Sequence, residues 1–209
     1  MQGQGALPQN EGKVVEQGKR EDRSVTSLVL VVGVLLAIAA FFVVTTAPIQ
    51  SLLGESSYAA ISAFHGLSAG LLLVVITIGL YQGYQLFEGR IVNLHDLKLL
   101  SVVAATMSFI TIVFGNWIYV GYRAKGSVRE WLLANNPEAH KIFFEFKEHM
   151  ALFTLPLAVL AVYLLYHYDM GLLERRWLRA VVAVILALTF FYFTVAFGLG
   201  AAITKIKPV

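Results

Sequence analysis

Five long runs of apolar residues limit what this chain can fold into. A helix needs about 20 predominantly apolar residues to cross ~30 Å of hydrocarbon, and each run meets that length. Backbone groups in lipid must pair within their own segment, so apolar spans fold as helices. The sequence therefore predicts an all-α integral membrane bundle of five transmembrane helices, with spans at about 25–46, 58–87, 97–122, 142–167 and 177–203.

Composition supports a membrane protein and excludes several functions. Of the 209 residues, 58% are hydrophobic and only 14% are charged, which is too apolar for a soluble domain of this size. The formal net charge of +3 is small and spread along the chain, so we expect a lipid bilayer and no nucleic acid as partner. The chain has no cysteine, which excludes disulfides, thiolate-held iron–sulfur clusters and haem attached through C-x-x-C-H.

The N-terminal part divides into a tail and a first span. Residues 1–24 are polar and rich in Gly and Gln, with mixed charges, so they cannot bury apolar area and are expected to be disordered. The run at 25–46 ends before Pro48, lacks a small-residue cleavage site and is longer than a typical signal peptide, so we interpret it as a retained anchor. The predicted domains are a tail, 1–24, and a transmembrane domain, 25–209.

Short loops give the orientation. The loop at 47–57 has no Lys or Arg, whereas the tight turn at 169–177 carries Arg175 and Arg176. Cytoplasmic loops carry an excess of these residues. We therefore expect a multi-pass protein of the cell inner (cytoplasmic) membrane, with the N-terminus in the cytoplasm and the C-terminus outside.

The longest connection, 123–141, lies outside in this topology. Trp131 and Leu132, next to charged residues, predict a short helix on the bilayer surface. Asn136 or its neighbour is placed to cap the next helix, with Pro137 at the first helical position. We expect the fourth helix to begin near Pro137, about two turns before the hydrocarbon.

Two histidines at matched depth give the main functional signal. The second and fourth helices run in the same direction, and His65 and His149 both fall near the outer membrane surface. Ionisable groups inside a span are costly and are usually functional. Two neutral imidazoles on facing helices can ligate a b-type haem without cysteine. The competing interpretation of His65 is a buried histidine bonded to a backbone carbonyl.

Small residues follow His65 and allow two interpretations. Gly66 and Gly70 form the G-x-x-x-G spacing. The functional interpretation is space for a flat macrocycle beside the helix. The alternative is close helix–helix contact, for which this spacing is well known.

Carboxylates surround His149. Glu145 lies four residues earlier on the same helical face, where it is able to orient the free ring nitrogen of a metal-bound histidine. The alternative is a solvated interfacial cluster in which Glu148 and Lys147 take part. His140 falls on the opposite face from His149 and is expected to be a surface histidine, a proton acceptor or a supporting group.

The third helix reaches the same surface with polar and aromatic residues. Haem propionates need cations or hydroxyl groups at the water edge, so Asn116, Tyr119, Arg123 and Lys147 are candidates for binding them. The alternative for each is interfacial anchoring. His95 and His167 fall at the other end of the spans, where interfacial histidines are expected.

Five spans, depth-matched histidines on two parallel helices and a basic, aromatic rim resemble small membrane cytochrome b subunits of electron-transfer complexes. The resemblance covers residues 25–203 and is architectural. It implies haem b with His65 and His149 as axial ligands, and electron exchange with a quinone or a larger membrane complex.

Two other functions remain open. His65, Glu145, Glu148, His149 and His140 are able to form an iron, copper or zinc site, since imidazole with carboxylate suits those ions. The other alternative is that the chain is a non-catalytic structural subunit of a membrane complex. Its small loops favour an electron-transfer or accessory subunit over a free-standing enzyme, because little chain is left for an extramembrane active site.

Overall fold

The computed structural model describes residues 57–90 and 93–207, and this part is all-helical without strands. The predicted tail and first span lie outside the described residues. The elements are α3 (Ser57–Phe87), α4 (Leu94–Tyr122), α5 (Val128–Asn135), η1 (Ala139–Phe144), α6 (Glu145–Tyr168), α7 (Gly171–Glu174) and α8 (Arg176–Ile206).

Four helices of the described part are long and apolar enough to cross a membrane. They cover Ala60–Phe87, Leu94–Tyr122, Ala139–Tyr168 and Arg176–Ile206. The shortest has 28 residues and is therefore about 42 Å long at ~1.5 Å per residue. That exceeds ~30 Å of hydrocarbon, so these helices tilt or protrude from it. Four of the predicted spans are confirmed, and the protein is a multi-pass membrane protein.

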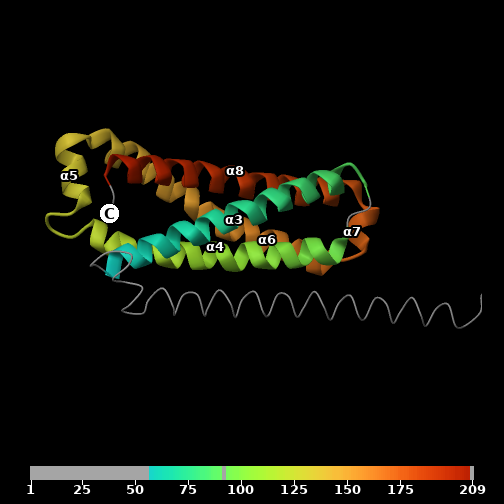
Figure 1. Cartoon of the computed structure of the whole chain (residues 1–209). Coiled ribbons are helices and arrows are strands. Elements are labelled where there is room, and N and C mark those ends of the chain that lie inside the picture. Colours follow the sequence, from blue (N-terminus) through green and yellow to red (C-terminus); the bar gives the residue numbers. More distant parts are fainter. Residues whose placement is uncertain (1–56, 91–92, 208–209) are drawn as a thin grey trace, which may run out of the picture. The chain divides into compact units, whose positions relative to one another are not determined.

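The four long helices lie side by side in a bundle (Figure 1). Helices α3 and α6 each pack against both α4 and α8. Consecutive helices run in opposite directions, so α3 and α6 are parallel to each other, as predicted. We call the end where α4 ends and α6 begins the α5 end, and the other the α7 end.

Packing follows the pattern expected in lipid. Leu72, Leu97 and Leu165 are fully buried between helices. Large apolar side chains also cover the outer surface, for example Val74 at 57% exposure and Val159 at 51%. Such a surface is costly in water and suits hydrocarbon.

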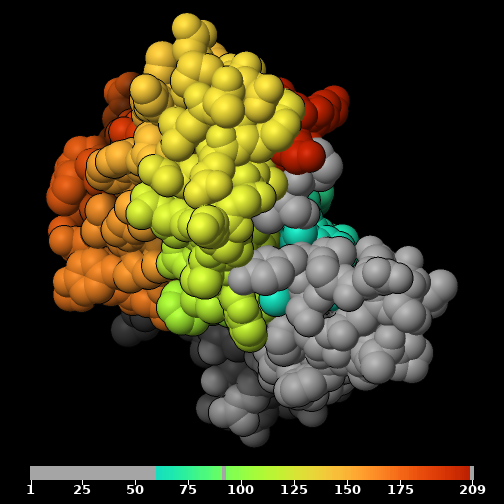
Figure 2. All heavy atoms as spheres, turned by 90° about the vertical axis from the view of Figure 1, so that its left-hand side faces the viewer, coloured from blue at the N-terminus to red at the C-terminus, as the bar shows by residue number. Residues whose placement is uncertain are grey.

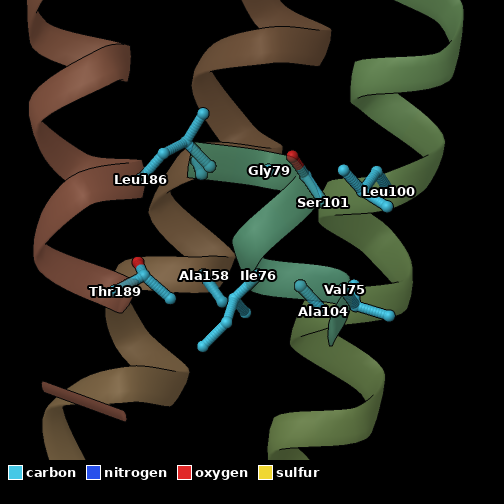
Figure 3. Close-up of a pocket in the computed structure, with 10 residues that line it drawn as sticks. Val75, Ile76, Gly79, Leu100, Ser101, Ala104, Ala158, Leu186 and Thr189 are labelled. Atoms are coloured by element: carbon cyan, nitrogen blue, oxygen red, sulfur yellow. The ribbon is translucent and has the colours of Figure 1, made fainter. Parts of the chain in front are cut away.

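A small void of about 20 Å³ lies in the middle of the bundle, between all four helices (Figure 3). Ser101 and Thr189 line it, but each hydroxyl already donates to the carbonyl four residues earlier in its own helix. A void of this size holds about one water molecule. It is too small and too apolar to be a ligand site.

The connection at the α5 end folds as the sequence predicts. The short helix is α5, and Asn136 Oδ1 accepts a hydrogen bond from the Ala139 N–H at 3.3 Å, while Pro137 is the first residue of the next helix. The sequence did not predict that the first turns, Ala139–Phe144, form a π-helix. Such segments are rare and occur frequently at functional sites.

Candidate functional site

A cavity of about 610 Å³ opens between the four long helices in the half of the bundle nearer the α5 end. Its walls come from residues 62–72, 108–122, 144–154 and 193–205. Along α6 it extends from Phe144 to Thr154, about 15 Å at ~1.5 Å per residue. Its volume lies within the ~300–1,000 Å³ of typical ligand sites.

His65 lines this cavity from α3 and is held by α4. Its Nδ1 lies 3.0 Å from the backbone carbonyl oxygen of Thr111. A carbonyl oxygen only accepts, so Nδ1 carries the proton and Nε2 of the neutral ring keeps its lone pair. The carbonyl bond was the competing interpretation of His65, yet it is also how proteins orient a metal-ligating imidazole.

Two glycines shape the surroundings of His65. A Cβ atom on Gly115 would lie 3.1 Å from His65 Cε1, so only glycine lets α4 approach the ring this closely. A Cβ atom on Gly66 or Gly70 would meet no described heavy atom within 4 Å. These two glycines therefore do not form a close helix contact within the described part, and Gly66 borders the cavity.

Polar groups line the cavity at several depths. Lys147 and Glu148 face it from α6, and Lys205 from α8. Lys147 Nζ lies 4.6 Å from the centre of the Phe144 ring. Deeper in the membrane, the buried hydroxyls of Ser108 and Thr154 find no hydrogen-bond partner within the described residues. The cavity is thus apolar in its walls with polar groups at both ends, as amphipathic ligands require.

The candidates on α6 separate onto two faces. Lys147 and Glu148 line the cavity, whereas His149 is exposed and does not. Two residues further along an α-helix correspond to a turn of about 200°, so His149 lies nearly opposite Lys147. His149 Nδ1 bonds to the backbone oxygen of Glu145 at 2.7 Å, and not to the Glu145 carboxylate. The structure does not bring His149 to the cavity with His65.

The predicted propionate-binding residues also divide. Asn116 and Tyr119 line the cavity, together with Lys147. Arg123 is the C-cap of α4 and stacks its guanidinium over the Tyr119 ring at 4.5 Å, outside the lining. Arg123 thus supports the aromatic wall from outside.

His140 is buried, with 4% of its surface exposed, so the prediction of a surface histidine is wrong. Its ring is inserted between α4 and α5. The Tyr122 hydroxyl lies 2.8 Å from Nδ1, and Arg129 Nε donates to Nε2 at 3.3 Å. The Glu145 carboxylate lies 3.8 Å from the same Nε2.

Within residues 57–90 and 93–207, no three His, Cys, Asp or Glu side chains gather to hold a metal ion. The five residues of the alternative metal site therefore lie in separate places: His65 and Glu148 at the cavity, Glu145 near His140, and His149 on the outer face. His95 and His167 lie at the α7 end. His167 stacks on Tyr163 with ring centres 5.2 Å apart.

Several lining residues were not predicted, namely Ser108, Thr111, Thr154 and Lys205. One signal was present for two of them. Ser108 and Thr111 share a face with Ser101 on a mostly apolar helix, at spacings of seven and three residues. Nothing in the sequence indicates that the Thr111 carbonyl bonds to His65.

Comparison with known proteins gives no relative: no family model, no curated protein and no solved structure matches this chain.

Proposed function

We propose that this protein is a membrane-embedded electron-transfer protein whose cavity would bind haem b, with His65 Nε2 as the nitrogen that would hold the iron. The observation that carries the proposal is the His65 imidazole. Its proton is held on Nδ1 by the Thr111 carbonyl, and its ring borders a cavity of about 610 Å³. A neutral imidazole oriented through its other nitrogen is the usual proximal ligand of haem iron.

The residues present fit such a group. Gly66, Ala69 and Ala196 leave flat space along the cavity wall, and Phe193 and Phe197 supply apolar surface for a macrocycle. Lys147 and Lys205 supply positive charge toward the α5 end, where propionates would be neutralised. Glu148 in the same wall is a negative charge that Lys147 offsets.

Ligation by His65 alone replaces the predicted histidine pair. His149 would reach the cavity only if α6 turned by about half a revolution, which would expose Lys147 and Ala151 to lipid. We therefore propose that, among the described residues, His65 alone would hold the iron. The bound haem would supply one-electron redox chemistry, and the protein would set its ligation, polarity and access.

The absence of a larger extramembrane domain in the described part favours a subunit of a larger membrane complex over an independent enzyme. A quinone in the bilayer is a suitable electron partner, because lipid surrounds the cavity walls. The larger membrane complex and the quinone are both part of this proposal, because the site lies within the membrane.

Reduced-minus-oxidised optical spectra of the purified protein test the proposal, after expression with haem supplied. We expect haem absorption bands in the wild type and in His149→Ala, and their loss in His65→Ala. His167→Ala at the α7 end is a matched control and should keep the bands. Absence of haem in a fully supplied wild type, or bands that survive in His65→Ala, would contradict the proposal.

A further inference from the structure

The strongest feature outside the cavity is the group of residues around His140 at the α5 end. It joins α4, α5, η1 and α6 through one buried ring. It also lies beside the cavity, because Tyr122 belongs both to this group and to the cavity wall.

Helix α5 packs against the back of the cavity wall at this end and does not itself line the cavity. Leu132 of α5 is fully buried and packs with Tyr122, Phe144 and Ile203, and all three line the cavity. In Figure 2, which looks at this end of the bundle, the yellow atoms of α5 and η1 lie at the front. Movement of α5 would therefore uncover the ring stack of Tyr122 and Phe144, whose centres are 4.2 Å apart.

A hydrogen bond from Arg129 to His140 ties α5 to the bundle. Arg129 Nε can only donate, so His140 Nε2 accepts and the ring is neutral. The ring proton is then on Nδ1 and is donated to the Tyr122 oxygen, 2.8 Å away. This assignment of the tautomer follows from the donors and acceptors on either side.

His140 Nε2 has a second neighbour, which accepts hydrogen bonds where Arg129 donates them. The Glu145 carboxylate lies 3.8 Å away and can only accept. A neutral His140 can bond Arg129 and not Glu145, whereas a protonated His140 can bond Glu145 and not Arg129. The other charged groups that act on the ring are Arg123 at the end of α4 and the adjacent Lys141.

We propose that α5 is a pH-dependent lid over the cavity, closed by Arg129 when His140 is neutral and released when His140 is protonated and pairs with Glu145. One proton from water adds to Nε2, the Arg129 hydrogen bond breaks, and a charged hydrogen bond to Glu145 forms. Release of Arg129 removes the tie between α5 and the His140 ring and leaves α5 held by apolar packing of Leu132 and Val128, by the Ser127 hydroxyl on the Tyr122 carbonyl and by Lys207 over the Trp131 ring. Loosening of α5 would then give a ligand access to the cavity from the α5 end. The lid does not depend on which ligand the cavity binds.

The chain has no cysteine, so spin labels can be placed at will. Ala134→Cys on α5 and Ala202→Cys on α8 are both exposed positions, and the distance between labels at these sites reports the lid. We would measure it by pulsed electron–electron double resonance in lipid nanodiscs over a series from about pH 8 down to about pH 4, because a buried imidazole takes up a proton at lower pH than a free one. We expect one narrow distance at high pH and a longer, broader one at low pH. Over the pH range in which His140 takes up its proton, the open-to-closed ratio should rise by up to about tenfold for each unit by which the pH falls, the limit for one proton.

Three variants decide the mechanism. His140→Gln cannot be protonated and should remove the pH dependence, whereas His149→Gln, an exposed histidine on the same helix, should keep it. Arg129→Met lacks the tie and should give the longer distance at both pH values, which provides a second test if His140→Gln does not fold. An unchanged wild-type distance, or a pH response that persists in His140→Gln, would overturn the proposal.

Discussion

Gly115→Ala offers the sharpest test of the packing around His65. The added Cβ would lie 3.1 Å from His65 Cε1, while ordinary contacts begin at 3.4 Å, so the ring must move by 3.4 − 3.1 = 0.3 Å. That movement lengthens or breaks the 3.0 Å bond between His65 Nδ1 and the Thr111 carbonyl. The matched control is Gly70→Ala on α3, where a Cβ meets no described heavy atom within 4 Å.

The two variants should change the free energy of unfolding by different amounts. Alanine in place of glycine inside a helix favours folding by about 1 kcal/mol, and Gly70→Ala should gain about that much. Gly115→Ala has the same gain but is offset by overpacking, which costs about 1–3 kcal/mol. We therefore expect Gly115→Ala to be less stable than Gly70→Ala by about 1–3 kcal/mol, since the gain is common to both.

Equilibrium unfolding in detergent, followed by circular dichroism, measures these free energies without any cofactor. Haem content of the same samples gives a second reading, because a displaced ring should bind less haem. Equal stability and equal haem content in the two variants would refute the account of His65 as a ring held between Gly115 and Thr111.

Two further predictions follow from single contacts. Asn136→Ala removes the side-chain acceptor at the start of the fourth span and should lower the free energy of unfolding by about 0.5–2 kcal/mol. The same unfolding experiment measures this change, and an unchanged free energy would mean that the cap contributes nothing to stability. In a haem titration, Lys147→Met should lower haem affinity by about tenfold, or ~1.4 kcal/mol, because it removes a positive charge from the cavity wall. Lys141→Met, at an exposed position, is the control and should leave the affinity unchanged. Equal effects of the two variants would exclude a specific role for Lys147.

The sequence predicts the membrane spans well because their physical requirement is length and hydrophobicity. The expected bounds at 58–87 and the observed α3, Ser57–Phe87, differ by one residue. The role of Asn136 was also predictable, because an asparagine followed by proline is a local signal that needs no tertiary contact.

The sequence did not predict which polar residues point into the bundle, and the reason is physical. Beyond its charged first turns, helix α6 is apolar nearly all round, so the sequence does not indicate which face turns inward. The π-helix at Ala139–Phe144 also shifts the phase between His140 and the residues after it. As a result, depth in the membrane singled out His65, which lines the cavity, but did not show that Lys147 faces the cavity while His149 faces outward.

The central claim is that His65 Nε2 is the nitrogen that binds haem iron in the cavity. Chemical rescue tests it most directly: haem-supplied His65→Ala protein is titrated with free imidazole, and the b-type bands are recorded at each addition. We predict that the variant lacks the bands and that imidazole restores them, because the small molecule fills the space of the deleted ring. Bands present without imidazole, or a variant that loads haem like the wild type, would contradict the claim.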